Sequence, residues 1–318
     1  MQERLEVSPG GFAFLDEDVI ITTDSDWNCR HIYHIPPTGS LEDLEVCLVH
    51  SIELPPMREQ HFISDFLCRS SPNPSSRLSY AVNKKTVDIP PYLPDPASAV
   101  IVFYMEAVDE ETVEDQFHNI GREEEPYTSD EFVMIVHRQS LLNLLPLDYT
   151  TNGSGIRNIL EPIPWSNWGP PISRWFKGDS FRHEMTLCAG QRYIEYDNQD
   201  YTGDRIPASL TILDFNLFSI KMALSNIEKK RPEDSYLDIF DRKESSNARL
   251  SVIGGVKIPD SIQNVFKPEG GHFVSDIHCM LPYLWVPTVE ELQTSSFHLG
   301  QDLLVALSIS VSCTVFQS

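Results

Sequence analysis

Four histidines and an acidic triplet are the first residues in this sequence whose types could support metal chemistry. His31 and His34 lie three positions apart, and His50 and His61 follow further along the chain. On a strand, positions three apart point to opposite faces, so these imidazoles are poorly placed to share a metal ion. The triplet 16–18 (Asp-Glu-Asp) offers oxygen ligands, but it lacks the ligand spacing and the glycine of a calcium-binding loop. We interpret the histidines as ordinary strand residues and the triplet as a hairpin turn.

Three further places carry residues that are used in nucleophilic catalysis or in phosphate binding. Ser154 stands between two glycines, but no strand-turn-helix pattern surrounds it. His183 and Cys188 are close in sequence, yet Cys188 lies in an apolar run, where burial raises the pKa of a thiol. The glycine pair 254–255 follows a strand as a phosphate loop would, but a third glycine and a following helix are missing. The sequence therefore predicts no catalytic residue, no metal ligand and no cofactor.

The charge of the chain is strongly one-sided. Its 318 residues include 24 Lys and Arg against 47 Asp and Glu, which gives a formal net charge of −23. Such a surface repels DNA, RNA and anionic lipid, so we expect neither a nucleic-acid partner nor a membrane partner. It favours high solubility or a basic protein partner.

The cysteines and the chain start indicate a reducing compartment. Six cysteines are scattered through apolar runs, and no two form a CxxC pair. This usage is typical of buried thiols in a reduced protein. The first residues lack the apolar core of a signal peptide, and no apolar run reaches the ~18 residues of a membrane helix. We expect a cytoplasmic or nuclear location.

Short strand-like runs recur along almost the whole chain, with turn residues between them. Helical periodicity is limited to residues 140–145 and 217–228. The C-terminal run 302–316, although apolar, alternates with serine as a strand does. The other expected strands are residues 12–15, 19–23, 30–35, 44–54, 98–105, 131–137, 185–189, 192–196, 209–215, 249–253 and 271–277.

The length and spacing of these runs favour a propeller over a repeated sandwich. Three sandwiches would need linkers between the copies, and the sequence contains none. Blades of about 40 to 50 residues would give six or seven copies. We predict an all-β, β-propeller-like fold of six or seven irregular blades, complete or incomplete, as a single domain over residues 1–318. Loop insertions are expected near 70–76, 109–130 and 225–247, and the acidic loop 109–130 could dock a basic segment.

The segment 164–176 (PWSNWGPPISRWF) concentrates three of the five tryptophans of the chain. Its prolines, Pro170 and Pro171, predict that the segment is not helical. Three indoles so close together need a mostly buried β framework to pack against. The indoles could form a recognition platform, but we favour a wedge between blades. Arg174 could bind a partner carboxylate, although pairing with an internal Asp or stacking on an indole is favoured.

This segment resembles a motif of a large family of uncharacterised basidiomycete-type (mushroom-type) fungal F-box proteins. In that family a β-rich C-terminal region carries Trp, two spacers, Trp-Gly and then Arg-Trp-Phe. Runs at 132–138, 210–216 and 281–283 are similar to further family landmarks, so the resemblance extends from about Phe12 to Tyr283. The matching residues, to which the resemblance gives a structural role, are Trp165, Trp168, Gly169, Arg174, Trp175, Phe176, Asp214, Phe215 and Asn216.

The resemblance implies a non-enzymatic protein-interaction scaffold. In relatives, such a region would select a target protein for a Skp–cullin–F-box ubiquitin ligase. The helices of an F-box are not found here, so a Skp-type adaptor is expected as a partner only if an F-box exists upstream. Two alternatives are a propeller-fold hydrolase or lyase with an acidic metal-binding channel, and a truncated copy without function. The sequence does not indicate the target protein.

Overall fold

The protein is described from a computed structural model, in which the chain divides into two compact units. Unit 1 comprises residues 1–180 and 264–280, and unit 2 comprises residues 181–263 and 281–318. The expectation of one domain over residues 1–318 remains a prediction. The structure describes residues 11–24, 28–35, 46–74, 96–110, 129–146, 161–178, 188–197, 208–229, 251–253, 265–292, 296–299, 303–307 and 313–317.

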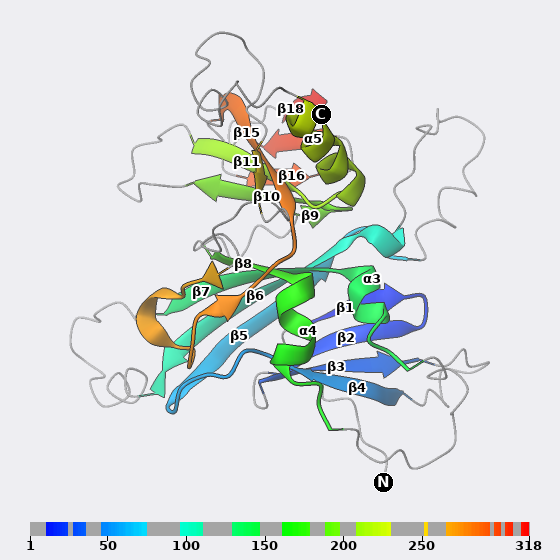
Figure 1. Ribbon diagram of the computed structural model, residues 1–318, viewed down its shortest axis with the longest axis vertical. Helices are drawn as coiled ribbons and strands as arrows, with labels where there is room; N and C mark the ends of the chain where they lie inside the picture. Colours follow the sequence, from blue (N-terminus) through cyan, green and yellow to red (C-terminus); the bar gives the residue numbers. More distant parts are fainter. Residues whose placement is uncertain are drawn as a thin grey trace. The chain divides into compact units, whose positions relative to one another are not determined.

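Unit 1 contains two four-stranded sheets, each an antiparallel meander in chain order (Figure 1). The first begins with the hairpin predicted around the acidic triplet, since Phe14 pairs with Ile20 and the turn lies between. The second consists of longer strands rich in β-branched and aromatic residues, which favour extended structure. The strands are β1 (Phe12–Asp16), β2 (Val19–Asp24), β3 (Cys29–His34), β4 (Cys47–Glu53), β5 (His61–Ser70), β6 (Val100–Asp109), β7 (Asp130–His137) and β8 (Ser173–Lys177).

One hydrophobic core joins the two sheets of unit 1. The hydroxyl of Thr23 on β2 donates to the carbonyl of Phe66 on β5, at 3.2 Å. Arg30 is fully buried between the sheets, with its guanidinium carbon 2.9 Å from the centre of the Phe66 ring. Burial raises the pKa of the Cys68 thiol to about 12, although Arg30 acts to lower it. This thiol is therefore a packing group in the neutral form.

A segment distant in sequence, residues 265–280, completes the core of unit 1. It contains β13 (Val265–Phe266), β14 (Ile277–His278) and the 3₁₀ turn η4 (Glu269–Gly271). Phe273 forms an isolated bridge with Met57, and its buried ring packs edge-on against Phe132 with centroids 5.4 Å apart. The extended strand predicted over 271–277 is wrong for most of its length, because turn η4 and a bend occupy it.

The tryptophan segment forms a helix, so the prediction that its prolines exclude one is wrong. Helix α4 (Trp165–Ile172) contains both Pro170 and Pro171 near its C-terminal end. Proline has a backbone angle suited to a helix, and its cost is a missing hydrogen bond and crowding of the preceding turn. Here that cost is confined to the end of an eight-residue helix, and burial of two indoles on the same helix offsets it. The free carbonyl of Pro170 accepts from the amide of Met280, at 2.8 Å.

Unit 1 also contains two shorter helical elements, one before β6 and one after β7. The helical turns predicted over 140–145 are confirmed for residues 140–142, which belong to α3 (Arg138–Leu142), and η2 (Pro96–Ser98) precedes β6. Arg138 is fully buried and donates to the carbonyl of Pro72, at 2.8 Å. The first part of the 70–76 insertion is therefore attached to α3. Most of the 109–130 insertion lies outside the described residues.

The described residues of unit 2 form a five-stranded antiparallel sheet, a three-stranded meander and one helix. The sheet has the order β12-β15-β11-β10-β9. The predicted helix over 217–228 is confirmed as α5 (Leu217–Lys229), which extends into the loop expected from 225. The strands are β9 (Cys188–Ala189), β10 (Arg192–Asp197), β11 (Ala208–Asp214), β12 (Ser251–Ile253), β15 (Tyr283–Leu292), β16 (Ser296–Leu299), β17 (Leu303–Leu307) and β18 (Cys313–Gln317). With strands dominant and every pair within the sheets antiparallel, the all-β class is confirmed.

Candidate functional site

The three indoles of the tryptophan motif pack together inside unit 1. Trp165 and Trp168 on α4 meet edge-on with ring centroids 4.9 Å apart, and Trp175 on β8 meets Trp165 at 5.8 Å. All three are buried, and the indole nitrogen of Trp168 donates to the carbonyl of Glu53 at 2.8 Å. Edge-to-face rings and a satisfied N–H are the arrangement expected of packed indoles. The cluster offers its rings to the core and not to solvent.

The other residues of this motif support the cluster. Gly169 faces the Trp165 ring so closely that a Cβ atom at this position would overlap it. Arg174 on β8 is buried, and its guanidinium contacts the Cys279 sulfur at 3.7 Å. Phe176 is half-buried two residues further along β8. The burial of Arg174 places its charge away from any surface that could bind a partner carboxylate.

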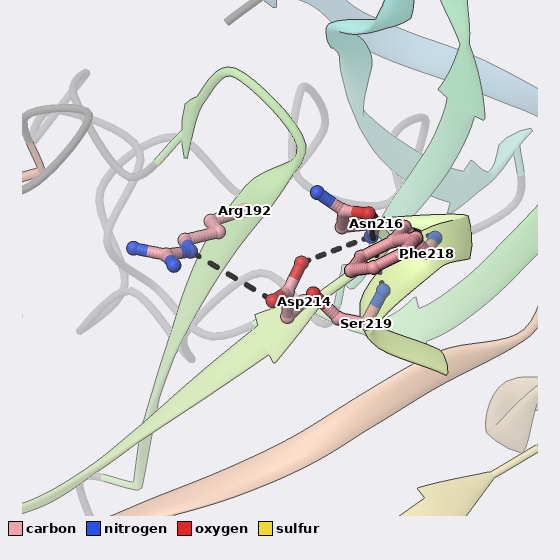
Figure 2. Close-up of polar contacts among 5 residues, drawn as sticks. All are labelled: Arg192, Asp214, Asn216, Phe218 and Ser219. Carbon is pink, nitrogen blue, oxygen red and sulfur yellow. Dashed lines mark hydrogen bonds and ion pairs between the residues drawn. The ribbon is translucent and has the colours of Figure 1, made fainter. Parts of the chain in front are cut away.

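The second predicted motif, Asp214-Phe215-Asn216, joins β11 to α5 in unit 2 (Figure 2). One carboxylate oxygen of Asp214 accepts from the Asn216 amide at 2.9 Å, and the other lies 3.9 Å from the Arg192 nitrogen. The side-chain oxygen of Asn216 accepts from the amides of Phe218 and Ser219, at 2.9 and 3.2 Å. Asn216 therefore caps the start of α5.

Phe215 gives this junction its apolar anchor. It is fully buried, its ring lies 5.5 Å from that of Tyr283, and its amide donates to the carbonyl of Gln191 at 2.8 Å. The residues that follow Asp214 are thus held to the sheet, and these bonds set the direction in which α5 leaves it.

Burial raises the pKa of the Asp214 carboxyl, and the Asn216 amide, Arg192 and Ser219 oppose this effect. A raised pKa means that the folded state keeps its proton to a higher pH than the unfolded state does. The sign is therefore that stability is lost as pH rises from the ordinary value of about 3.9 through the raised folded value. At neutral pH the ionised carboxylate carries a desolvation cost that these three groups offset only in part.

We expect Asp214→Asn to remove this pH dependence while preserving the junction, because the amide oxygen of Asn can still accept from Asn216. Its free energy of unfolding at pH 7 should equal or exceed that of the wild type. Asp214→Ala should instead lose about 1–3 kcal/mol, since the Asn216 amide is left unsatisfied. Urea unfolding at pH 4 to 8 measures this, and a wild-type slope retained in Asp214→Asn would contradict it.

A third group, which the sequence did not indicate as a unit, lies at the end of the second sheet of unit 1. His272 Nε2 and Asp130 Oδ2 are 2.8 Å apart, and His272 Nδ1 and His61 Nδ1 are 3.0 Å apart. His272 is buried, and the two imidazoles meet edge-on. Gly270 has a positive φ of 79°, and a Cβ atom there would overlap the Asp130 carboxylate. We call Asp130, His272 and His61 the imidazole chain.

The sequence missed this group because its members come from β5, β7 and the 265–280 segment. The sequence places His61 near three other histidines, whereas its hydrogen-bond partner, His272, is 211 positions away. The glycine pair at 270–271 was the one local signal, since two adjacent positive φ angles mark a close approach of the backbone.

The remaining candidates are not brought together. His31 binds the Ser51 hydroxyl at 2.8 Å, and His34 binds Asp18 at 3.1 Å, at the acidic turn. Burial lowers the pKa of His50, and a backbone hydrogen bond with Ser51 opposes this effect. Cys188 is buried on β9. Three predicted candidates lie outside the described residues: Ser154, His183 and the glycine pair 254–255.

Within the described ranges, no three His, Cys, Asp or Glu side chains gather as a metal-binding group. Among the helices of those same ranges, none combines the length and the apolar character needed to cross a membrane. Comparison of the chain with models of protein families, with curated proteins and with solved structures found no match.

Proposed function

We propose that the protein is a non-enzymatic protein-interaction scaffold with a β-propeller-like architecture. By its resemblance, it corresponds to the target-recognition region of an F-box protein in a Skp–cullin–F-box ubiquitin ligase. A Skp-type adaptor would take part only if an F-box exists upstream of these residues.

The repeated sheets of unit 1 support the architecture. Strands β1 to β4 and β5 to β8 are two successive four-stranded antiparallel meanders, and such a meander is the repeating blade of a propeller. They share one core, as neighbouring blades do. A fold of six or seven irregular blades would continue this repeat.

The observation that carries the binding role is the exposed apolar face of α5. Phe218 is 71% exposed, and Met222, one turn further on, is 50% exposed, with Leu217 beside them at 48%. Residues four apart lie on one side of a helix, so Phe218 and Met222 form one surface. Exposed large apolar side chains on a rigid element mark interaction sites.

The cap at Asn216 and the buried Phe215 hold this surface in a fixed position on the sheet. A fixed anchor loses little entropy on binding, which raises affinity. Since the chain carries a net charge of −23, the partner that fits is a polypeptide with an apolar anchor flanked by basic residues.

We expect Phe218→Asp to weaken binding of such peptides at least about tenfold, because it places a charge in the apolar contact. The probe is an array of peptides with one aromatic or aliphatic residue between lysines and arginines, and affinities are measured by fluorescence anisotropy. Val274→Asp is the matched control, since Val274 is 58% exposed but belongs to unit 1. Absence of binding by the wild type, or equal loss in both variants, would contradict the proposed surface.

A further inference from the structure

The segment 265–280 is attached to the rest of unit 1 by two kinds of contact. Apolar residues enter the core, and backbone bonds tie the segment to the residues before β5. The Arg58 amide donates to the His272 carbonyl at 2.9 Å, and the Val274 amide donates to the Pro56 carbonyl at 3.0 Å. The imidazole chain adds a fastening of a different kind, because its strength depends on how many protons it holds.

The geometry of the chain limits the number of protons. The Asp130 carboxylate can only accept, so Nε2 of His272 carries the proton between them. The two Nδ1 atoms lie 3.0 Å apart, and a hydrogen bond at that distance holds one proton. When both imidazoles are cationic, each Nδ1 atom carries a proton, so the hydrogen bond between them is lost and two positive charges face each other.

The charged groups around the pair do not remove this limit. Asp130 is held by His272, and it stabilises one positive charge there. Asp109 lies opposite His61 in the register of β5 and β6. On the other side, Arg58 lies beside Gly271 and donates to the Phe273 carbonyl at 3.1 Å, which adds positive charge near the pair.

We propose that the imidazole chain is a pH-sensitive latch. It holds residues 265–280 against the rest of unit 1 while one proton lies between the two Nδ1 atoms, and it releases them when both imidazoles are cationic. Histidine is the side chain that responds to mild acidification, so the release follows a fall in pH. The opened form binds one proton more than the closed form, so opening becomes more favourable as pH falls. This regulation is independent of the α5 surface.

Cys279 provides the readout, because it is a buried thiol within the latched segment. Labelling by N-ethylmaleimide in the full chain, read for each cysteine by mass spectrometry, reports its opening. Cys68, buried on β5, reports opening of the rest of unit 1 in the same sample. We expect the ratio of the Cys279 rate to the Cys68 rate to rise about tenfold from pH 7.5 to pH 5.5.

Two variants and one control test the assignment. His61→Gln cannot take up the second proton, so its ratio should not rise on acidification. Asp130→Asn removes the negative charge that stabilises the closed form with one cationic imidazole. The rise in the ratio of labelling rates should therefore move to higher pH. His31→Gln, on β3, should behave as the wild type. A flat wild-type ratio would overturn the latch without any variant, and so would a rise that persists in a folded His61→Gln protein.

Discussion

Replacing Trp168 with alanine is expected to lower the free energy of unfolding of unit 1 by about 3–5 kcal/mol. Trp168 is 1% exposed, so removal of its ring leaves a large cavity between α4 and the core. Its edge-on contact with Trp165 is lost as well, and so is the bond from its indole nitrogen to Glu53. No other single side chain of the tryptophan motif combines these three contributions.

Trp168→Phe separates the contribution of the buried ring to stability from the contribution of the indole hydrogen bond. It keeps most of the apolar volume but leaves the Glu53 carbonyl without its donor, so a loss of about 1–3 kcal/mol is expected. Urea unfolding followed by tryptophan fluorescence measures both variants, with the transition of unit 1 assigned from labelling of Cys68. A loss below about 1 kcal/mol in Trp168→Ala would show that the indole is not a core residue.

Gly169→Ala should destabilise unit 1 by about 1–3 kcal/mol, although alanine is the better helix former by about 1 kcal/mol. The two effects have opposite signs, and the geometry decides between them. A Cβ atom at residue 169 would overlap the six-membered ring of Trp165, which is itself packed against two other indoles. The ring has no room to move, so overpacking outweighs the gain in helix propensity.

Ser166→Ala is the matched control for this substitution. Ser166 is exposed on the same helix, so its replacement by alanine should leave stability unchanged or raise it slightly. Both variants are compared by thermal unfolding under one set of conditions. Greater stability of Gly169→Ala than of the wild type would mean that the Trp165 ring does not pack against the helix backbone.

The sequence predicted the elements that depend on local pattern. Alternating and β-branched runs marked most strands correctly, and the 217–228 periodicity marked α5. It missed β5, because charged and polar residues such as Asp65 and Arg69 interrupt its apolar pattern. It also missed β15, where Pro287 argues against a strand although the residue before it pairs with Ile212 of β11.

The tryptophan segment shows why local rules fail where packing dominates. Its prolines argued against a helix, and the structure places them in the last turn of α4, where few backbone bonds depend on them. The imidazole chain could not be predicted from the sequence for another reason. Its three members are brought together by the return of the chain from unit 2 to unit 1, which no local spacing encodes.

That return has a consequence for the order in which the protein is made. The ribosome synthesises residues 1–180, then residues of unit 2, and only afterwards the segment that supplies Phe273, Ile277 and Cys279 to the first core. Until about residue 280 has left the exit tunnel, the nascent chain exposes the apolar surface that this segment later covers. Unit 1 therefore completes its hydrophobic core only after most of its own residues have been synthesised.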